Sequence, residues 1–185
     1  MQTVLLVEGA SDRIAIETLA RRRSQDLTEI RIVSLDGVTN ASKAIAEFGP
    51  RGRGLRLAGL CDAGEERYIR GGLERAGLGP VATREGMERL GFFVCVADLE
   101  DELIRSLGTP AVEDVLAKEG DLAAFRVFQN QPFQRDRPID RQLHRFFGTI
   151  AGRKAQYALA LVEALDLGRV PRPLEALLDF VAQAA

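Results

Sequence analysis

Acidic side chains lie at or just after the ends of three apolar segments in the first hundred residues. With two further acids nearby, they form a set of five: Glu8, Asp12, Asp62, Asp98 and Glu100. Carboxylates held a few ångströms apart in a partly buried cleft repel one another strongly. Divalent ions that prefer oxygen ligands, Mg²⁺ or Mn²⁺, relieve that repulsion. If the fold brings the five residues together, they predict a metal site.

The apolar segments themselves indicate how the acids are positioned. Four of them predict strands, at residues 4–7, 30–35, 55–61 and 91–96. Helical patterns separate the four strands, at residues 13–23, 41–48 and 65–76. Strands that alternate with helices are typical of an α/β fold with a parallel sheet. The carboxyl ends of such strands meet at one edge, where ligands bind, so Glu8, Asp62 and Asp98 are expected to lie close together.

The pattern changes after residue 107, and the rest of the chain is expected to be helical. Helices are predicted at residues 110–119, 121–129, 139–147, 152–166 and 173–184. We therefore expect two parts, an α/β domain at 1–108 and a helical extension at 109–185 that packs on the sheet.

The acids have a simpler alternative interpretation as helix caps. Asp is a common N-cap residue, and Asp12 or Ser11 is suited to cap the helix predicted to begin near Arg13. Capping also explains Ser11 better than a nucleophilic role, because no base lies near it in the sequence. Glu8 is a poor cap type, so capping accounts less well for the whole set.

Charge is unevenly distributed along the 185 residues. The net charge is -2, but residues 121–160 carry seven Lys or Arg against three acids, which makes that segment +4 and the remainder -6. A basic surface beside an acidic one suits an anionic polymer held near a cation site. The alternative is an ordinary solvated helical surface.

Cysteine and histidine usage indicates no further chemistry. Cys61 and Cys95 lie inside predicted strands and are expected to be core thiols instead of a disulfide or a metal pair. The single histidine, His144, precedes Arg145 and a Phe pair and is expected to serve packing. No signal pattern and no bilayer-length apolar run are present, so a cytoplasmic protein without membrane contact is expected.

Several short motifs in this sequence resemble those of a known family. Val7-Glu8-Gly9 followed by Asp12, with a later strand that ends at Asp62, resembles the Toprim domain of topoisomerases, bacterial primases and OLD (overcoming lysogenization defect) nucleases. The resemblance covers residues 2–107. The acidic stretch from Asp98 to Leu103 and the segment Gly152-Arg153-Lys154 are similar to motifs of the OLD branch.

The resemblance implies a four-stranded parallel sheet between helices and a nuclease that cleaves DNA with two Mg²⁺ or Mn²⁺ ions. Glu8, Asp12 and Asp62 would hold one ion, and Asp98 and Glu100 would help to hold the other. Glu8 would also relay the proton of the attacking water, and Lys154 would stabilise charge on the transition-state phosphate. Arg141, Arg145, Arg153 and Lys154 would contact nucleic acid. Each basic residue has the alternative of a plain surface position.

One departure from the family pattern leaves the activity open. Toprim domains usually carry Asp-x-Asp after the third strand, where this chain has Asp62-Ala63-Gly64. Glu65 or Glu66 could substitute in a different register. One alternative is therefore a catalytically weakened nucleic-acid-binding or regulatory module that acts with a separate ATPase, since the ATPase domain usual in OLD proteins is not in this sequence. A phosphotransfer domain of the receiver type is a third reading, although no lysine ends the fourth strand.

Overall fold

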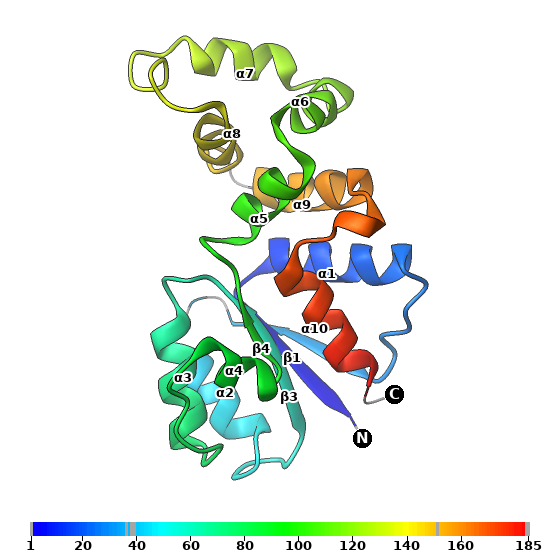
Figure 1. Cartoon of the computed structure of the whole chain (residues 1–185), viewed down its shortest axis with the longest axis vertical. Coiled ribbons are helices and arrows are strands. Elements are labelled where there is room, and N and C mark those ends of the chain that lie inside the picture. Colours follow the sequence, from blue (N-terminus) through cyan, green and yellow to red (C-terminus); the bar gives the residue numbers. More distant parts are fainter. Residues whose placement is uncertain (1, 36, 38–39, 151, 184–185) are drawn as a thin grey trace.

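The structure, a computed structural model, describes residues 2–35, 37, 40–150 and 152–183. Within them, a sheet of four parallel strands in the order β2-β1-β3-β4 lies at the centre (Figure 1). The strands are β1 (Thr3–Val7), β2 (Ile30–Ser34), β3 (Arg56–Cys61) and β4 (Phe92–Val94). The predicted α/β class and four-stranded parallel sheet are confirmed.

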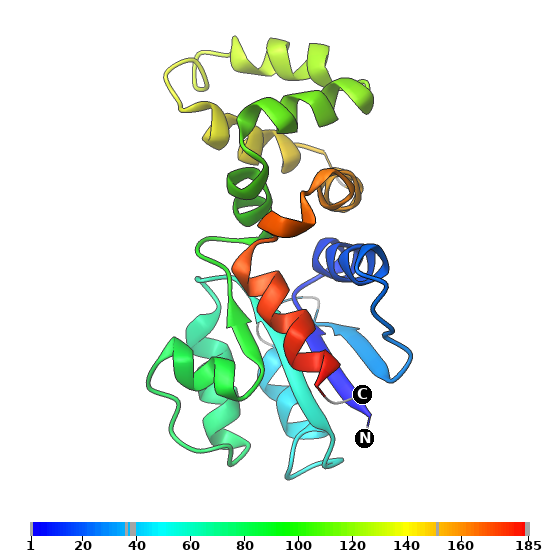
Figure 2. The same ribbon diagram turned by 45° about the vertical axis from the view of Figure 1, so that its right-hand side comes forward.

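Helices cover both faces of the sheet. The described residues form these α-helices: α1 (Ala10–Arg22), α2 (Ala41–Phe48), α3 (Glu66–Arg75), α4 (Arg84–Arg89), α5 (Leu99–Leu107), α6 (Thr109–Lys118), α7 (Leu122–Gln129), α8 (Ile139–Phe147), α9 (Arg153–Ala164) and α10 (Arg172–Ala182). Side chains alternate along β1. Val4 and Leu6 pack in the core with α2, α3 and α4, whereas Leu5 and Val7 pack in the core with α1 and α10 (Figure 2). β1 is thus buried on both faces, as its unbroken apolar run predicts.

The helices after β4 leave the sheet and then return to it. Beyond α5, helices α6, α7 and α8 form a lobe at one end of the molecule (Figures 1 and 2). α9 then packs along α1, and α10 lies against β3 and β4. At the other end of the molecule, the start of β1 and the end of α10 lie near each other (Figures 1 and 2).

One apolar core joins the two predicted parts. It contains Leu5 of β1 and Leu60 of β3 together with Leu161 of α9 and Leu177 of α10. Polar contacts cross the same boundary, because Arg22 donates to the backbone carbonyls of Val162 at 2.6 Å and Leu165 at 2.8 Å. The division at residue 108 stays a prediction about domain organisation.

Most predicted elements agree with the structure, with three differences. α1 begins at Ala10, three residues before the predicted start. α4 and α5 were not predicted at all. Cys61 and Cys95 are free and buried, as expected of core thiols. Within the described residues, no helix is long and apolar enough to cross a membrane.

Candidate metal centre

Acidic residues in or next to four separate elements line one cavity at the carboxyl ends of β1 and β3. Its volume is about 270 Å³. Glu8 directly follows β1, Asp62 directly follows β3, and Glu100 lies in the first turn of α5. The full lining is Glu8, Gly9, Ser11, Asp12, Gly37, Asp62, Glu100 and Lys154. The parallel sheet therefore brings together four of the five predicted acids and the predicted lysine.

Asp12 is buried at the start of α1 and serves the helix as well as the cavity. Its Oδ2 atom accepts a hydrogen bond of 2.9 Å from the backbone amide of Gly9. Burial raises the pKa of Asp12 to about 6, and the negative charges of Glu100 and Glu8 add to the increase against the opposing Gly9 hydrogen bond. The N-cap of α1 is Gly9, so the prediction that Ser11 or Asp12 occupies the cap position is wrong, although Asp12 accepts the amide of that cap residue from inside the first turn. This hydrogen bond leaves the charge of the cavity uncompensated.

Asp62 is the most strongly perturbed acid of the cavity. Burial raises its pKa to about 8, and the neighbouring charges of Glu8, Asp12 and Asp98 raise it further, as does a side-chain hydrogen bond with Glu8. Two carboxyl groups that share a hydrogen bond need a proton between them. Near neutral pH, the cavity without cations therefore retains protons that a divalent ion would displace.

The two glutamates after Gly64 take different positions. Glu66 pairs with Arg84 at 2.8 Å and with Arg70 at 3.5 Å. Glu65 instead responds to the acids of the cavity: burial raises its pKa to about 7, and the charges of Glu8 and Asp12 contribute. Of the two candidates to replace the acid missing at Gly64, Glu65 is thus the one whose ionisation is linked to the cluster, whereas Glu66 is held by arginines.

A second group of possible ligands lies next to the cavity. Asp98, Glu100 and His144 each offer one ligand atom, and these atoms lie within 4.8 Å of one another. Asp98 caps α5, since its Oδ1 accepts the amide of Asp101 at 2.9 Å. Its Oδ2 lies 2.5 Å from Nε2 of His144. Burial opposes ionisation of Asp98, but the hydrogen bonds from His144 and Asp101 outweigh it and lower its pKa.

His144 was expected to serve packing, and that prediction is wrong. The side chain is 30% exposed and bonds to Asp98. The hydrogen bond to Asp98 raises the pKa of His144. The two residues are 46 positions apart in the sequence, so no local pattern could reveal the contact.

Glu100 connects the two groups, because it lines the cavity and belongs to the second set. Its Oε2 accepts a hydrogen bond of 3.2 Å from Nζ of Lys154. Burial acts to lower the pKa of Lys154, but the charge of Glu100, their hydrogen bond and the charges of Asp98 and Asp62 together outweigh it, and the pKa is raised. Among the described residues, the buried Oε1 of Glu100 has no hydrogen-bond partner. An orphaned buried carboxylate oxygen is costly unless something else occupies its vicinity.

The predicted arginines lie in three different environments. Arg145 is exposed on α8. Arg141 is 56% exposed and lies 3.6 Å from Asp101. Arg153 is held inside the helical lobe: its side chain is 9% exposed, lies 3.5 Å from Asp121 and stacks on the ring of Phe146 at 4.1 Å. Only Arg141 and Arg145 are free to approach a large polyanion.

The donor set fits hard divalent ions. Four carboxylates and one ammonium group surround the cavity, and oxygen-rich, acidic sites of this kind suit Mg²⁺ or Mn²⁺. Glu8, Asp12 and Asp62 would hold one ion, and Asp98 and Glu100 the other, with Glu100 near both. The orphaned Glu100 oxygen and the raised pKa of Asp62 are both relieved by such cations.

The sheet order, the helices on both faces and the acidic cavity are those of an α/β protein whose ligand site lies at the carboxyl ends of parallel strands. Residues 1–62 match the family model described as "Overcoming lysogenization defect protein-like, TOPRIM domain". A search among curated proteins found no match.

Solved structures extend the likeness to nearly the whole chain. The chain is 21% identical to the C-terminal region of the Burkholderia pseudomallei OLD protein, with a TM-score of 0.75, and the match covers 98% of this chain and 97% of that one. It is 23% identical to the C-terminal region of the Xanthomonas campestris pv. campestris OLD protein, with a TM-score of 0.76, covering 99% and 93% of the two chains. The chain therefore has the Toprim fold and resembles the C-terminal region of OLD proteins.

Proposed function

We propose that this protein is a divalent-metal-dependent nuclease that cleaves DNA phosphodiester bonds. The observation that carries the proposal is the convergence of Glu8, Asp12, Asp62 and Glu100 on one cavity. When fully ionised, such a cluster needs cations to balance its charge, and cations held there would in turn attract the negative charge of a phosphodiester. Mg²⁺ or Mn²⁺, when bound as a pair, would supply Lewis acidity and a metal-activated water to an in-line displacement.

The chain's own residues would perform the remaining steps. Glu8 lines the cavity and shares a side-chain hydrogen bond with Asp62, and it would take up a proton from the attacking water. Lys154, half exposed and 3.2 Å from Glu100, is placed to meet the charge that develops on the phosphate. Arg141 and Arg145 on α8 would hold the nucleic-acid backbone. Contact with DNA, and cooperation with a separate ATPase, belong to the proposal.

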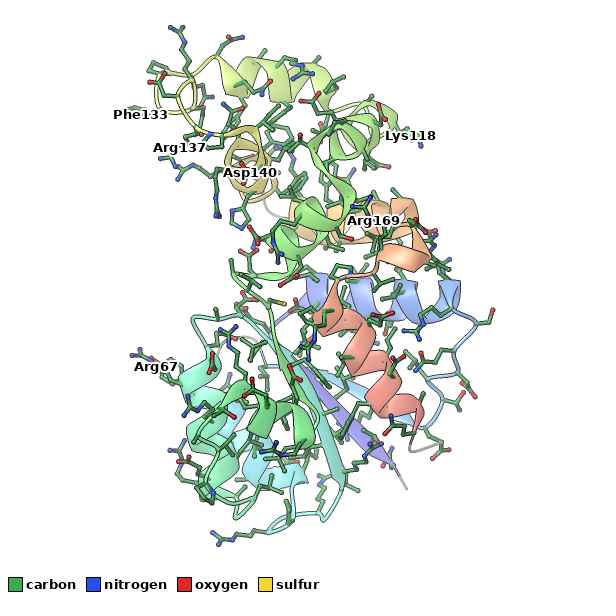
Figure 3. The ribbon with its side chains drawn as sticks, viewed as in Figure 1. Arg67, Lys118, Phe133, Arg137, Asp140 and Arg169 are labelled. Atoms are coloured by element: carbon green, nitrogen blue, oxygen red, sulfur yellow. The ribbon has the colours of Figure 1, made fainter. Side chains whose placement is uncertain are left out.

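A supercoiled-plasmid nicking assay with Mg²⁺ or Mn²⁺ tests this function. The variants Glu8→Ala, Asp98→Ala and Lys154→Ala are expected to lose cleavage by about 10²- to 10³-fold, the range for removal of one group that stabilises a transition state. Glu17→Ala and Lys118→Ala serve as matched controls. Glu17 is exposed on α1 and, among the residues that the structure describes, pairs only with nearby Arg13. Lys118 projects into solvent from α6 (Figure 3). Equal cleavage by all variants would contradict the assignment.

The second candidate is a metal-dependent nucleic-acid-binding module without cleavage. Gly64 favours it, because no carboxylate occupies that position and nothing lies within 4 Å of a Cβ built there. This candidate predicts that the wild-type protein retards DNA in the presence of Mg²⁺ yet leaves every plasmid intact. The variant Gly64→Asp, which restores the acid, would then distinguish a lost activity from one that never existed. Plasmid nicking by this variant but not by the wild type would indicate that the wild type has lost a metal ligand.

A further inference from the structure

The second ligand group contains a nitrogen donor as well as carboxylates. Nε2 of His144 lies 2.5 Å from Oδ2 of Asp98, and an oxygen of Glu100 completes a set within 4.8 Å. Three ligand atoms this close can all reach one metal ion, since metal–ligand bonds are about 2.0–2.2 Å long for such donors. α8 delivers the imidazole, and α5 delivers both carboxylates.

Glu100 provides an independent sign that something binds here. Its side chain is 7% exposed, and its Oε1 has no hydrogen-bond partner within the described part of the chain. Lys154 compensates only the other oxygen. A buried carboxylate oxygen that is left without a partner costs free energy unless a ligand satisfies it. A cation held with Asp98 and His144 would have the Glu100 carboxylate as its third ligand.

The ligand types then indicate which cation. An imidazole nitrogen is a good ligand for divalent transition ions and a poor one for Mg²⁺, which prefers oxygen ligands in octahedral geometry. The neighbouring cavity residues Glu8, Asp12 and Asp62 offer oxygen alone. The two positions therefore differ in chemistry, although both are acidic.

We propose that Asp98, Glu100 and His144 form a mixed nitrogen–oxygen site that selects a first-row transition ion such as Mn²⁺ over Mg²⁺. The ion replaces the hydrogen between Nε2 and Asp98: that proton leaves to solvent, Nδ1 keeps its hydrogen, and the Nε2 lone pair binds the metal. This inference rests on the proposed function only in that both place a second ion at Asp98 and Glu100.

The competing interpretation is that His144 only positions Asp98 through their hydrogen bond. In that case an ion at the second position would have oxygen ligands alone, and removal of the imidazole would weaken Mg²⁺ and Mn²⁺ equally. Direct coordination makes the two ions respond differently. The decisive quantities are thus the presence of nitrogen in the coordination sphere and the ratio of the two affinities.

Pulsed EPR of Mn²⁺ bound to the tag-free full chain tests the coordination directly. The sequence contains a single histidine, so any imidazole ¹⁴N coupling to Mn²⁺ must come from His144. We expect the wild type to show this coupling, and His144→Ala and His144→Gln to lack it. In competition titrations, both variants should lose the preference for Mn²⁺ over Mg²⁺ by about 10- to 100-fold, the scale of effects at metal sites.

Two further variants control the measurement. Asp140→Asn removes a half-exposed carboxylate from the same helix (Figure 3) and should change neither the coupling nor the affinity ratio. Glu8→Ala should remove the oxygen-only ion and keep the ¹⁴N coupling. Bound Mn²⁺ without ¹⁴N coupling in the wild type, or an unchanged affinity ratio in His144→Ala, overturns the proposal.

The same samples separate this inference from the nuclease proposal. Both EPR and titration are made without DNA. Nitrogen-coupled Mn²⁺ in a protein that leaves plasmid intact would overturn the nuclease function and support the mixed site. Plasmid cleavage that requires Glu8 and Asp98, by a protein whose bound Mn²⁺ shows no ¹⁴N coupling, would support the nuclease function and overturn the mixed site.

Discussion

Asp62 and Asp98 are the same residue type and follow neighbouring strands, yet their pKa values change in opposite directions. Burial and three acidic neighbours raise the pKa of Asp62 to about 8. Asp98 is also buried, but it accepts hydrogen bonds from the amide of Asp101 and from His144, and its pKa is lowered. The difference follows from the partners: the charges that act most strongly on Asp62 are those of acids, whereas Asp98 accepts hydrogen bonds from two donors. Asp62 is therefore the residue whose ionisation depends most on a cation.

We predict that Mg²⁺ stabilises the protein more at pH 8 than at pH 5. The pKa of Asp62 rises from its ordinary 3.8 to about 8 on folding, so between these values the folded chain binds a proton that the unfolded chain has released. Without metal, the free energy of unfolding therefore falls as pH rises through this window. Mg²⁺ at about 100 times its Kd should then raise Tm by about 5–10 °C at pH 8 and by less at pH 5, where protons compete.

Thermal unfolding with and without Mg²⁺ at several pH values checks this prediction. In Asp62→Asn, which holds no proton to displace, the stability of the metal-free protein should vary less with pH. A Mg²⁺ effect that is larger at pH 5 than at pH 8 would contradict the assigned ionisation.

Residue-level prediction from sequence succeeded where a strand end marks the position and failed where a contact is long-range. Glu8 and Asp62 each directly follow a strand, and both line the cavity. His144 and Arg153 lie on helices whose neighbours could not be inferred, and the structure gave them roles opposite to expectation. His144 meets Asp98 at the site, while the Arg153 side chain is buried against Phe146.

At the scale of elements, the contact between α10 and the sheet depends on a glycine. Gly91, just before β4, has a φ of +86°, and a Cβ built there would overlap the ring of Phe180 on α10. That ring cannot move away easily. It packs on Phe93 with a centroid distance of 6.2 Å, and the guanidinium of Arg56 lies 4.0 Å from its centroid.

We predict that Gly91→Ala destabilises the protein more than Gly120→Ala. Both glycines have positive φ, +86° and +80°, but nothing lies within 4 Å of a Cβ on Gly120. The control should therefore lose only about 1–2 kcal/mol from backbone strain, and Gly91→Ala should lose about 1–3 kcal/mol more from overpacking. Urea unfolding of both variants measures the difference in their free energies of unfolding. Equal losses would contradict the prediction, because they would show that α10 accommodates the added methyl group without further destabilisation.

Periodicity located most helices but missed two, for different physical reasons. α4 has only six residues, and Met87 is its one buried residue within the described chain, so no apolar period is visible. α5 buries three consecutive acids, Glu100, Asp101 and Glu102. A run of acids normally indicates a solvated face, and it was interpreted as a ligand motif instead of a helix. Cations partly compensate this burial: Arg105 pairs with Asp101 at 2.8 Å and with Glu102 at 2.7 Å, and Lys154 lies 3.2 Å from Glu100.

At the scale of the whole molecule, the helical extension completes the α/β part. α10 covers one face of β3 and β4, and α9 covers α1. Gln25 also donates to the carbonyl of Leu178 at 2.8 Å. The site is shared in the same way, since Lys154 and His144 come from the extension. The sequence predicted that the extension packs on the sheet, but not that its last helix lies directly on two strands, because apolar periodicity does not identify the partner of a helix face.

We predict that residues 1–108 alone do not form a cooperatively folded unit. Without α9 and α10, apolar side chains of α1, β3 and β4 would face water, and exposed apolar surface of this kind favours aggregation or a loosely packed state. Near-UV circular dichroism and binding of a hydrophobic dye compare the fragment with the full chain. A sharp unfolding transition without dye binding in the fragment would contradict the prediction, and addition of residues 109–185 in trans provides a rescue control.

The start of β1 and the end of α10 lie together at the end of the molecule opposite the helical lobe (Figures 1 and 2). The cavity begins where β1 finishes, and five residues of strand span roughly 16 Å. A fluorophore, an affinity handle or a bead linker joined at either terminus would therefore leave the carboxylates unobstructed. Immobilised protein attached in this way should accept long polymers from solution as freely as untethered protein does.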